Sequence, residues 1–337
     1  MDPVSHVAFG RTLIALRRPG STASGTIGAA MLGSLTPDID AAFMPFGWDR
    51  YLRVHEIGTH SIPGALACAA LTAGVIWPAR RETRFTWLLG GAAIGALGHV
   101  VLDVVSGAAL RLFWPFADRH VTLPLVAMAD PILLSLLVAG VIALIAAGRH
   151  RQRLAAGIAL AVVGLFLSVK GMLALNALHA YESARPTETA DARVVEAGWA
   201  TMRDWTVFDR TESEVRAWRV KAGSPGADLL LHWPRPRLDG LVAASTAWPT
   251  VRNFQRPHDL QLVTIAAQTD GHVTVLWSDL RFCSDARDRP SPGDQPVLLG
   301  DDGRRMACAL WFGGEADADG RLVRQIVRVG TWVQTRK

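Results

Sequence analysis

Uncharged apolar stretches dominate the first half of the chain. Runs without Asp, Glu, Lys or Arg occupy 19–37, 61–79, 85–102, 131–148 and 154–169, and the last run continues past Lys170 to Ala180. A membrane-spanning helix needs about 20 mostly apolar residues, so the last four runs predict spanning helices. The run 19–37 is rich in Gly, Ser and Thr, and the apolar run 4–16 is short. Each of these two predicts either a span or a short helix packed within a bundle.

The pattern changes near residue 182, where charged residues become frequent and apolar positions alternate with polar ones. Alternating runs predict strands at 215–220, 260–266, 273–280, 306–312 and 322–329. Asp270-Gly271 predicts a hairpin turn between two of them, and 241–254 is the stretch with a helical pattern. The sequence therefore predicts an α+β chain, with a polytopic α-helical membrane domain at 1–181 and a small, mainly β soluble domain at 182–337.

Composition narrows the classes of protein that fit. Half of the residues are hydrophobic and only 19% are charged, whereas a soluble domain carries about 25% charged residues. Such a composition excludes intrinsic disorder, and three cysteines are too few for a disulfide-rich scaffold. The net charge of +5 is carried by small arginine clusters between apolar runs. These indicate loops that orient a membrane protein, and we expect no nucleic-acid partner.

The arginine clusters also predict an orientation. They lie at 17–18, 80–84 and 149–153, and all three are cytoplasmic if the two N-terminal segments form a membrane-inserted hairpin. The segments 38–60 and 107–123, and everything after Ala180, then lie outside the cytoplasm. Four arginines in those outer segments oppose this arrangement but are outnumbered. We expect a multi-pass protein with a periplasmic C-terminal domain.

Histidine and aspartate gather near the outer ends of the apolar segments. Ionisable groups in membrane segments are costly and usually face a cavity or a partner. We therefore predict one or two divalent metal ions, with zinc favoured and manganese or iron also suited to mixed imidazole and carboxylate ligands. The candidate ligands are His6, Asp38, Asp40, His55, His60, His99 and Asp103.

Each pair of candidate ligands also has a simpler interpretation. His99 and Asp103 are spaced i, i+4, which places both on one helix face, but a hydrogen-bonded core histidine has the same pattern. Asp38 and Asp40, separated by one residue, fit either metal ligation or an Asp-rich turn. His60 precedes a predicted helix start at Ser61, so it is either a ligand or a cap.

Four further residues are candidates for catalysis. Asp130 and Asp118 are candidate acid–base groups, Glu56 is a candidate base, and Arg119 is suited to binding an anionic substrate oxygen. The alternatives are a helix N-cap for Asp130, an ion pair between Asp118 and Arg119 or a lipid contact for Arg119, and an exposed loop position for Glu56.

Six short motifs occur in a fixed order along the first 131 residues: Met-Asp-Pro-x-x-His, Leu-x-Pro-Asp-Ile-Asp, His-x(4)-His-Ser, Gly-His-x-x-x-Asp, Trp-Pro-Phe-x-Asp-Arg and Asp-Pro. As a set they resemble the membrane-bound metal-dependent hydrolases, also described as LexA-binding, inner-membrane-associated hydrolases. Residues 251–254 and 277–282 resemble the C-terminal region of that family. His55-Glu56 departs from it, because the family commonly has His-Arg there. The N-terminal pattern is distantly similar to zinc-dependent phospholipase C.

The resemblance implies a hydrolase of the bacterial inner membrane without naming its substrate. A site at the membrane surface predicts that metal-activated water attacks a lipid or lipid-linked ester, with a phosphoester ahead of an acyl ester. The alternative is a non-enzymatic, metal-stabilised membrane scaffold whose β domain binds a protein partner.

The cysteines provide a further expectation. Cys283 ends the strand-like run 273–282, and Cys308 lies within the run 306–312. If the two runs are antiparallel neighbours, the two sulfurs can bond in an oxidising compartment. Two buried thiols are the alternative. Cys68, within an apolar run, is expected to remain a free thiol.

Overall fold

The computed structural model describes residues 1–17, 24–47, 51, 54–55, 57–185, 190–255, 258–267, 272–285, 297–299 and 305–336. The chain divides into two compact units. The helical unit comprises Met1–Ala42, Val54–Asn176 and Glu196–Asp204, and the β unit comprises Phe43–Arg53, Ala177–Val195 and Trp205–Lys337. The α+β class predicted from the sequence is confirmed.

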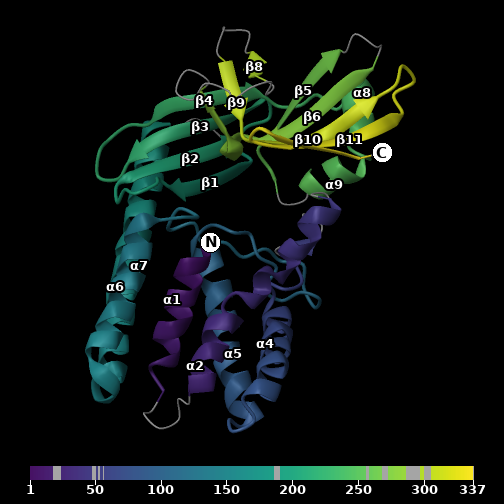
Figure 1. Ribbon diagram of the computed structural model, residues 1–337. Helices are drawn as coiled ribbons and strands as arrows, with labels where there is room; N and C mark the ends of the chain where they lie inside the picture. The colour runs from purple at the N-terminus through teal and green to yellow at the C-terminus, as the bar shows by residue number, and fades with distance from the viewer. Residues whose placement is uncertain are drawn as a thin grey trace. The chain divides into compact units, whose positions relative to one another are not determined.

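In the part of the chain that the structure describes, we give bounds for six α-helices and two 3-10 segments before the sheets (Figure 1). They are α1 (Pro3–Ile14), α2 (Ser24–Gly33), η1 (Thr36–Phe46), α4 (Ile62–Ile76), η2 (Trp77–Ala79), α5 (Phe85–Val105), α6 (Pro131–Ala146) and α7 (Gly148–Ala184). Three of the helices begin in the same way, because Asp2, Ser61 and Asp130 accept backbone N–H groups of the first turn and a proline stands at the first or second helical position.

Three helices are long and apolar enough to cross a membrane: Ile62–Ala79, Phe85–Val105 and Gly148–Ala184. The remaining predicted span, 131–148, contains the 16-residue helix α6. This helix is about 24 Å long, which is shorter than the hydrocarbon core of a bilayer, about 30 Å thick. The two N-terminal runs form the shorter helices α1 and α2, although 19–23 lie outside the described residues. Both are packed against α5.

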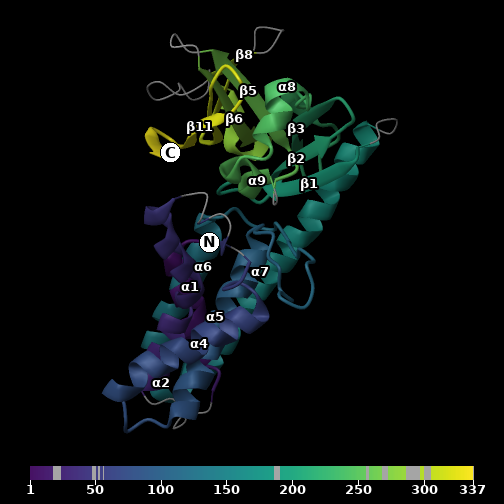
Figure 2. The ribbon, with the colours of Figure 1, turned by 90° about the vertical axis from the view of Figure 1, so that its right-hand side faces the viewer.

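Helix α5 is the centre of the helical unit, with α1, α2 and α4 packed against it (Figure 2). Small side chains form most of this core, including Ala29, Ala65, Ala69, Ala92 and Ala96. Glycine brings α2 and α5 into backbone contact. A Cβ atom on Gly95 would lie 2.0 Å from the carbonyl oxygen of Ala30, and one on Gly33 would lie 2.4 Å from that of Ala92. Small residues allow this close approach between helices.

The arginine clusters share one end of the helical unit. In Figure 1 the α4–α5 and α6–α7 turns, which carry 80–84 and 149–153, lie at the end opposite to the N-terminus. The Arg17 guanidinium, 5.2 Å from the centre of the Trp87 ring, lies at that end too; Arg18 is outside the described residues. The other end of the helical unit carries His6, Asp38, His60 and Asp103.

The described part of the β unit contains three antiparallel sheets. The first sheet has the order β1 (Ala192–Ala197), β2 (Asp204–Arg210), β3 (Glu214–Lys221), β4 (Asp228–Pro234). The second has the order β12 (Trp332–Arg336), β11 (Leu322–Val329), β10 (Leu310–Ala316), β6 (Val273–Asp279), β5 (Gln261–Ala267). The third has the order β7 (Cys283–Asp285), β9 (Arg305–Cys308), β8 (Val297–Leu299). Between strands lie α8 (Gly240–Ser245), α9 (Pro249–Gln255) and η3 (Leu280–Phe282).

Each of the five predicted strand runs overlaps a strand, although Leu260 precedes β5 and Leu280 belongs to η3. The run 306–312 is split into β9 and β10 at Ala309, whose N–H donates to the carbonyl oxygen of Phe282. The predicted helix 241–254 is two short helices, because the chain cannot continue helically into Pro249. The predicted turn Asp270-Gly271 lies outside the described residues, although β5 and β6 are antiparallel neighbours.

The predicted disulfide is confirmed. Cys283 in β7 lies directly opposite Cys308 in β9, and their Cα atoms are 3.9 Å apart. The N–H of Ala309, which follows Cys308, donates to the carbonyl oxygen of Phe282, which precedes Cys283. The two cysteines are therefore a non-hydrogen-bonded pair of the antiparallel ladder. Side chains approach most closely at such pairs. Cys68 is a buried free thiol in α4, as expected.

We predict that Gly95→Ala destabilises the helical unit. The added Cβ would meet the α2 backbone at Ala30, and overpacking of this kind costs about 1–3 kcal/mol or more. The thermal unfolding midpoint of the detergent-solubilised protein should therefore fall. Gly28→Ala on α2 is the matched control, because its Cβ would meet nothing within 4 Å. Equal midpoints for the two variants would contradict the close packing of α2 on α5.

Candidate metal centre

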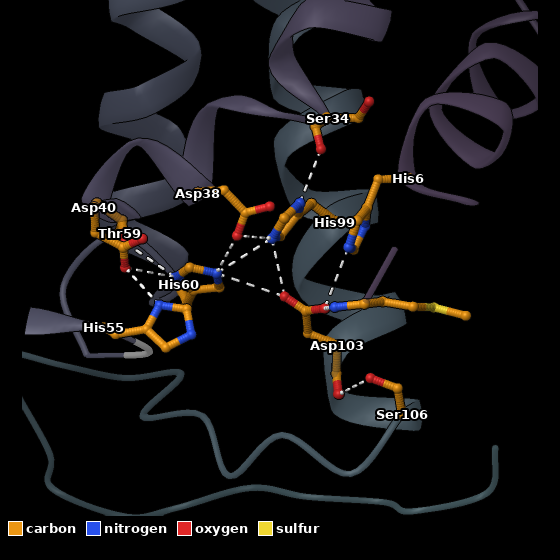
Figure 3. Close-up of polar contacts among 11 residues, drawn as sticks. His6, Ser34, Asp38, Asp40, His55, Thr59, His60, His99, Asp103 and Ser106 are labelled. Atoms are coloured by element: carbon orange, nitrogen blue, oxygen red, sulfur yellow. Dashed lines mark hydrogen bonds and ion pairs between the residues drawn. The ribbon is translucent and has the colours of Figure 1, made fainter. Parts of the chain in front are cut away.

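The seven predicted metal ligands come together at one end of the helical unit (Figure 3). His6 lies in the first turn of α1, Asp38 and Asp40 lie in η1, and His55 and His60 precede α4. His99 and Asp103 occupy the last two turns of α5. Three overlapping groups of these residues place ligand atoms within 4.8 Å of one another: His6, Asp38 and His99; Asp40, His55 and His60; and His60, His99 and Asp103.

Four atoms form the tightest set: His60 Nε2, His99 Nε2, Asp38 Oδ1 and Asp103 Oδ2. The two imidazole nitrogens are 3.2 Å apart. His60 Nε2 lies 3.3 Å from Asp38 Oδ1 and 3.5 Å from Asp103 Oδ2. His99 Nε2 lies 3.5 Å and 2.9 Å from the same two oxygens. Tetrahedral ligation at bond lengths of about 2.0–2.1 Å separates ligand atoms by about 3.3 Å, so these five separations are close to those of a zinc site.

Hydrogen bonds on the far side of each imidazole determine which nitrogen carries the proton. His99 Nδ1 lies 2.8 Å from the carbonyl oxygen of Ser34, which can only accept. Thr59 donates its hydroxyl to Asp40 Oδ2 at 3.1 Å, so its oxygen accepts from His60 Nδ1 at 3.0 Å. A neutral imidazole at either position then directs its Nε2 lone pair into the set. This is the tautomer that a metal requires.

His6 adds a third imidazole beside this set. Its ring is completely buried and stacks on His99, with ring centroids 3.8 Å apart. Neither ring nitrogen has a well-formed hydrogen bond among the described residues, although Nε2 lies 3.3 Å from Asp103 Oδ1. The N-terminal amine of Met1 donates to that same oxygen at 2.7 Å. A buried imidazole without a hydrogen bond is unusual, and a bound cation would satisfy it.

Asp40 lies on the other side of His60. Its carboxylate is 2% exposed, with Oδ2 3.1 Å from His55 Nδ1 and 3.6 Å from His60 Nδ1. Asp38 and Asp40 face different groups because residues two apart on a 3-10 helix point in different directions. Asp40 therefore orients His60 through Thr59, and together with His55 it offers a second place for an ion.

The four-atom set is open to solvent at Asp38. Asp38 has 38% of its side chain exposed, whereas His60, His99 and Asp103 have 5% or less. Burial raises the pKa of Asp38, but hydrogen bonding and the charges of the neighbouring histidines outweigh burial and hold the pKa below its ordinary value. Asp38 is thus the accessible member of the set and remains ionised, as a metal ligand must.

The candidate catalytic residues do not join these groups. Asp118 is 73% exposed and pairs with Arg111 at 2.6 Å, rather than with Arg119, which is also exposed. Asp130 is buried and caps α6 by accepting from Ile132 and Leu133, so the capping interpretation is confirmed. Glu56 lies outside the described residues. The catalytic roles of these four residues stay predictions.

Sequence reasoning missed Ser34, whose carbonyl oxygen orients His99. The signal that points to it is the four-residue spacing of Gly91, Gly95 and His99 on one face of α5. The two glycines bring α2 close, with a Cβ on Gly91 falling 2.6 Å from the Thr26 carbonyl oxygen. This approach carries Ser34 to the imidazole one turn further along.

Comparison with known proteins gives a family. The model of the YdjM inner membrane protein family matches residues 1–177, more than half of the chain, and the chain belongs to this family. The match includes every candidate metal ligand. The uncharacterized protein YfhP of Bacillus subtilis (strain 168) is 29% identical over 138 residues, which are 39% of this chain and 42% of that relative. No solved structure matches. Neither comparison shows similarity to a hydrolase or to phospholipase C.

We predict that His99→Ala and Asp103→Ala each lose bound metal while the protein still inserts into the membrane, because each change removes one atom of the four-atom set. Elemental analysis of the purified variants measures this directly. His150→Ala is the matched control, because His150 is exposed at the start of α7. Wild-type metal content in both ligand variants would refute the assignment.

Proposed function

We propose that this inner membrane protein is a metal-dependent hydrolase that cleaves a lipid or lipid-linked ester, with a phosphoester ahead of an acyl ester. The observation that carries the proposal is that two imidazole nitrogens lie 3.2 Å apart and each lies 2.9–3.5 Å from the same two carboxylate oxygens. Nitrogen and oxygen ligands in this number suit zinc first, and manganese or iron as alternatives.

The open side of the site favours catalysis over a purely structural role. A structural zinc site is closed by protein ligands, whereas a catalytic site keeps a position for water. Asp38 is the member of the set that solvent reaches. A bound divalent ion lowers the pKa of a water ligand to about 7 and polarises the ester that is cleaved. The competing proposal, a metal-stabilised scaffold for a protein partner, requires no such opening.

The chain's own groups have distinct tasks in this proposal. Ser34 and Thr59 keep the lone pairs of His99 and His60 directed into the site. For proton transfer we place Asp118 ahead of Asp130, because Asp118 is exposed whereas Asp130 already caps a helix. Arg119 and Glu56 are retained for binding an anionic oxygen and for base catalysis.

The position of the site supports a lipid substrate. The ligands lie at the ends of α4 and α5, two helices suited to spanning a membrane. The loop that follows α5 exposes Phe113, Trp114 and Phe116, and aromatic side chains of this kind favour the level of the lipid headgroups. A substrate that resides in the membrane would therefore have its headgroup near the site.

We further propose that the protein is multi-pass and that the β unit is periplasmic. The arginine clusters lie at the end of the helical unit opposite to the metal centre, which supports a cytoplasmic location for that end. The Cys283–Cys308 bridge supports an oxidising compartment for the β unit.

We predict that the zinc-loaded protein in lipid nanodiscs hydrolyses at least one member of a panel of phospholipids, lipid phosphates and acyl esters. His60→Ala and Asp38→Asn should lower kcat/KM at least a hundredfold, because each removes a ligand, whereas His150→Ala should not. A metal-loaded wild-type protein that cleaves no member of the panel would favour the scaffold.

The periplasmic placement predicts the redox state of the cysteines. In protein taken from its native membrane and alkylated without reductant, Cys283 and Cys308 should resist alkylation and appear as one linked peptide pair in mass spectrometry. Cys68 should be alkylated after unfolding, because it is a buried free thiol. Free thiols at both 283 and 308 would contradict the bridge and the placement that it supports.

A further inference from the structure

An apolar furrow leads away from the metal centre along the helical unit. It encloses about 360 Å³ between the α2–η1 segment and α4. One wall consists of Leu32, Leu35 and Ile39, and the other of Leu71, Val75 and Ile76. We propose that this furrow holds one acyl chain of the lipid substrate and thereby places the ester of that lipid at the metal centre. The inference rests on the proposed function and names the part of the substrate that the chain recognises.

The two threonine hydroxyls that line the furrow already form hydrogen bonds within the protein, so the furrow suits a hydrocarbon chain. Thr36 and Thr72 face each other with hydroxyl oxygens 2.6 Å apart. The Thr36 hydroxyl also lies 2.8 Å from the carbonyl oxygen of Leu32, and the Thr72 hydroxyl donates to that of Cys68 at 2.9 Å. Both hydroxyls are satisfied within the protein, so the walls offer a polar ligand no partner before Asp38 is reached.

Asp38 joins the furrow to the metal centre. It is a lining residue of the furrow, and its Oδ1 is 3.3 Å from His60 Nε2 and 3.5 Å from His99 Nε2. The accessible member of the four-atom set is therefore also part of the furrow wall. A lipid whose chain lies in the furrow would have its polar end beside that set.

The furrow opens toward the environment of the spanning helices. Leu32, Leu71 and Val75 are 52%, 50% and 72% exposed, and α4 lies within a candidate span. An acyl chain can enter sideways from the bilayer. Because lipid tails are as apolar as leucine, transfer of the chain into the furrow gains little hydrophobic free energy. The furrow therefore orients the substrate more than it binds it.

Filling the furrow tests the inference. Val75→Trp, or Leu71→Trp as a second variant, places an indole within it. Ile145→Trp on α6 is the matched control, because Ile145 is 71% exposed and Val75 is 72% exposed. Each protein is reconstituted in phosphatidylcholine vesicles that contain phosphatidic acid with a photoactivatable diazirine in one acyl chain. Labelled peptides are then mapped by mass spectrometry, and metal content reports folding.

We expect wild-type labelling within 32–39 and 71–76, reduced at least fivefold in the furrow variants but not in the control, with metal content unchanged in all. Hydrolysis of the long-chain lipid should fall at least tenfold in the furrow variants, whereas hydrolysis of water-soluble bis(p-nitrophenyl) phosphate should not change.

Equal labelling in Val75→Trp and Ile145→Trp would overturn the inference. Hydrolysis of the soluble ester without furrow labelling refutes the furrow alone. Furrow labelling without hydrolysis of any ester refutes the hydrolase and supports the furrow as a lipid site.

Discussion

With neutral histidines, acceptor atoms that face one another repel, and this constraint governs the helical unit. The two imidazole Nε2 atoms lie 3.2 Å apart, and each lies 2.9–3.5 Å from the same two carboxylate oxygens, at one end of a bundle of apolar helices. Unpaired charge is expensive in such a place. A divalent cation at their centre converts the repulsion into attraction. The hydrogen bonds from His99 to Ser34 and from His60 to Thr59 prepare the site for such a cation, because they leave the Nε2 atom of each neutral ring free to bind it.

The helix packing serves this centre. Close contact of α2 with α5, permitted by Gly33 and Gly95, brings the Ser34 carbonyl within hydrogen-bonding distance of His99. Caps at Ser61 and Asp130 begin α4 and α6 at the same end of the unit at which α5 ends. The same packing leaves an apolar furrow beside Asp38, because α2 and α4 contact α5 through small residues and keep their large side chains outside. Ligand geometry and access to the membrane thus have a common origin.

Local patterns made much of this predictable from the sequence. The spacing of His99 and Asp103 fixes a shared helix face, uncharged runs identify the long apolar helices, and alternation locates the strands. The pairing of Cys283 with Cys308 followed from two strand-like runs, and the structure confirms it. These signals depend on residues close together in the sequence, and local backbone geometry determines them.

Long-range contacts account for what the sequence did not reveal. Ser34 and His99 are 65 residues apart, and no local pattern pairs a backbone carbonyl with an imidazole. Asp38 and Asp40 looked equivalent in the sequence, but the 3-10 geometry of η1 places Asp38 on the Nε2 side of His60 and Asp40 on its Nδ1 side. Asp118 pairs with Arg111 and not with the adjacent Arg119. The segment 110–121 folds back on itself through the bridge between Leu110 and Val121, which brings Arg111 beside Asp118.

X-ray absorption at the zinc K edge of the purified, metal-loaded protein tests the central claim most directly. Our account predicts nitrogen and oxygen scatterers at about 2.0–2.1 Å, together with the outer-shell scattering of at least two imidazole rings from His60 and His99. Loss of one imidazole in His60→Ala should be visible in that outer shell. Sulfur ligation, or zinc bound with no imidazole scattering, would contradict the account.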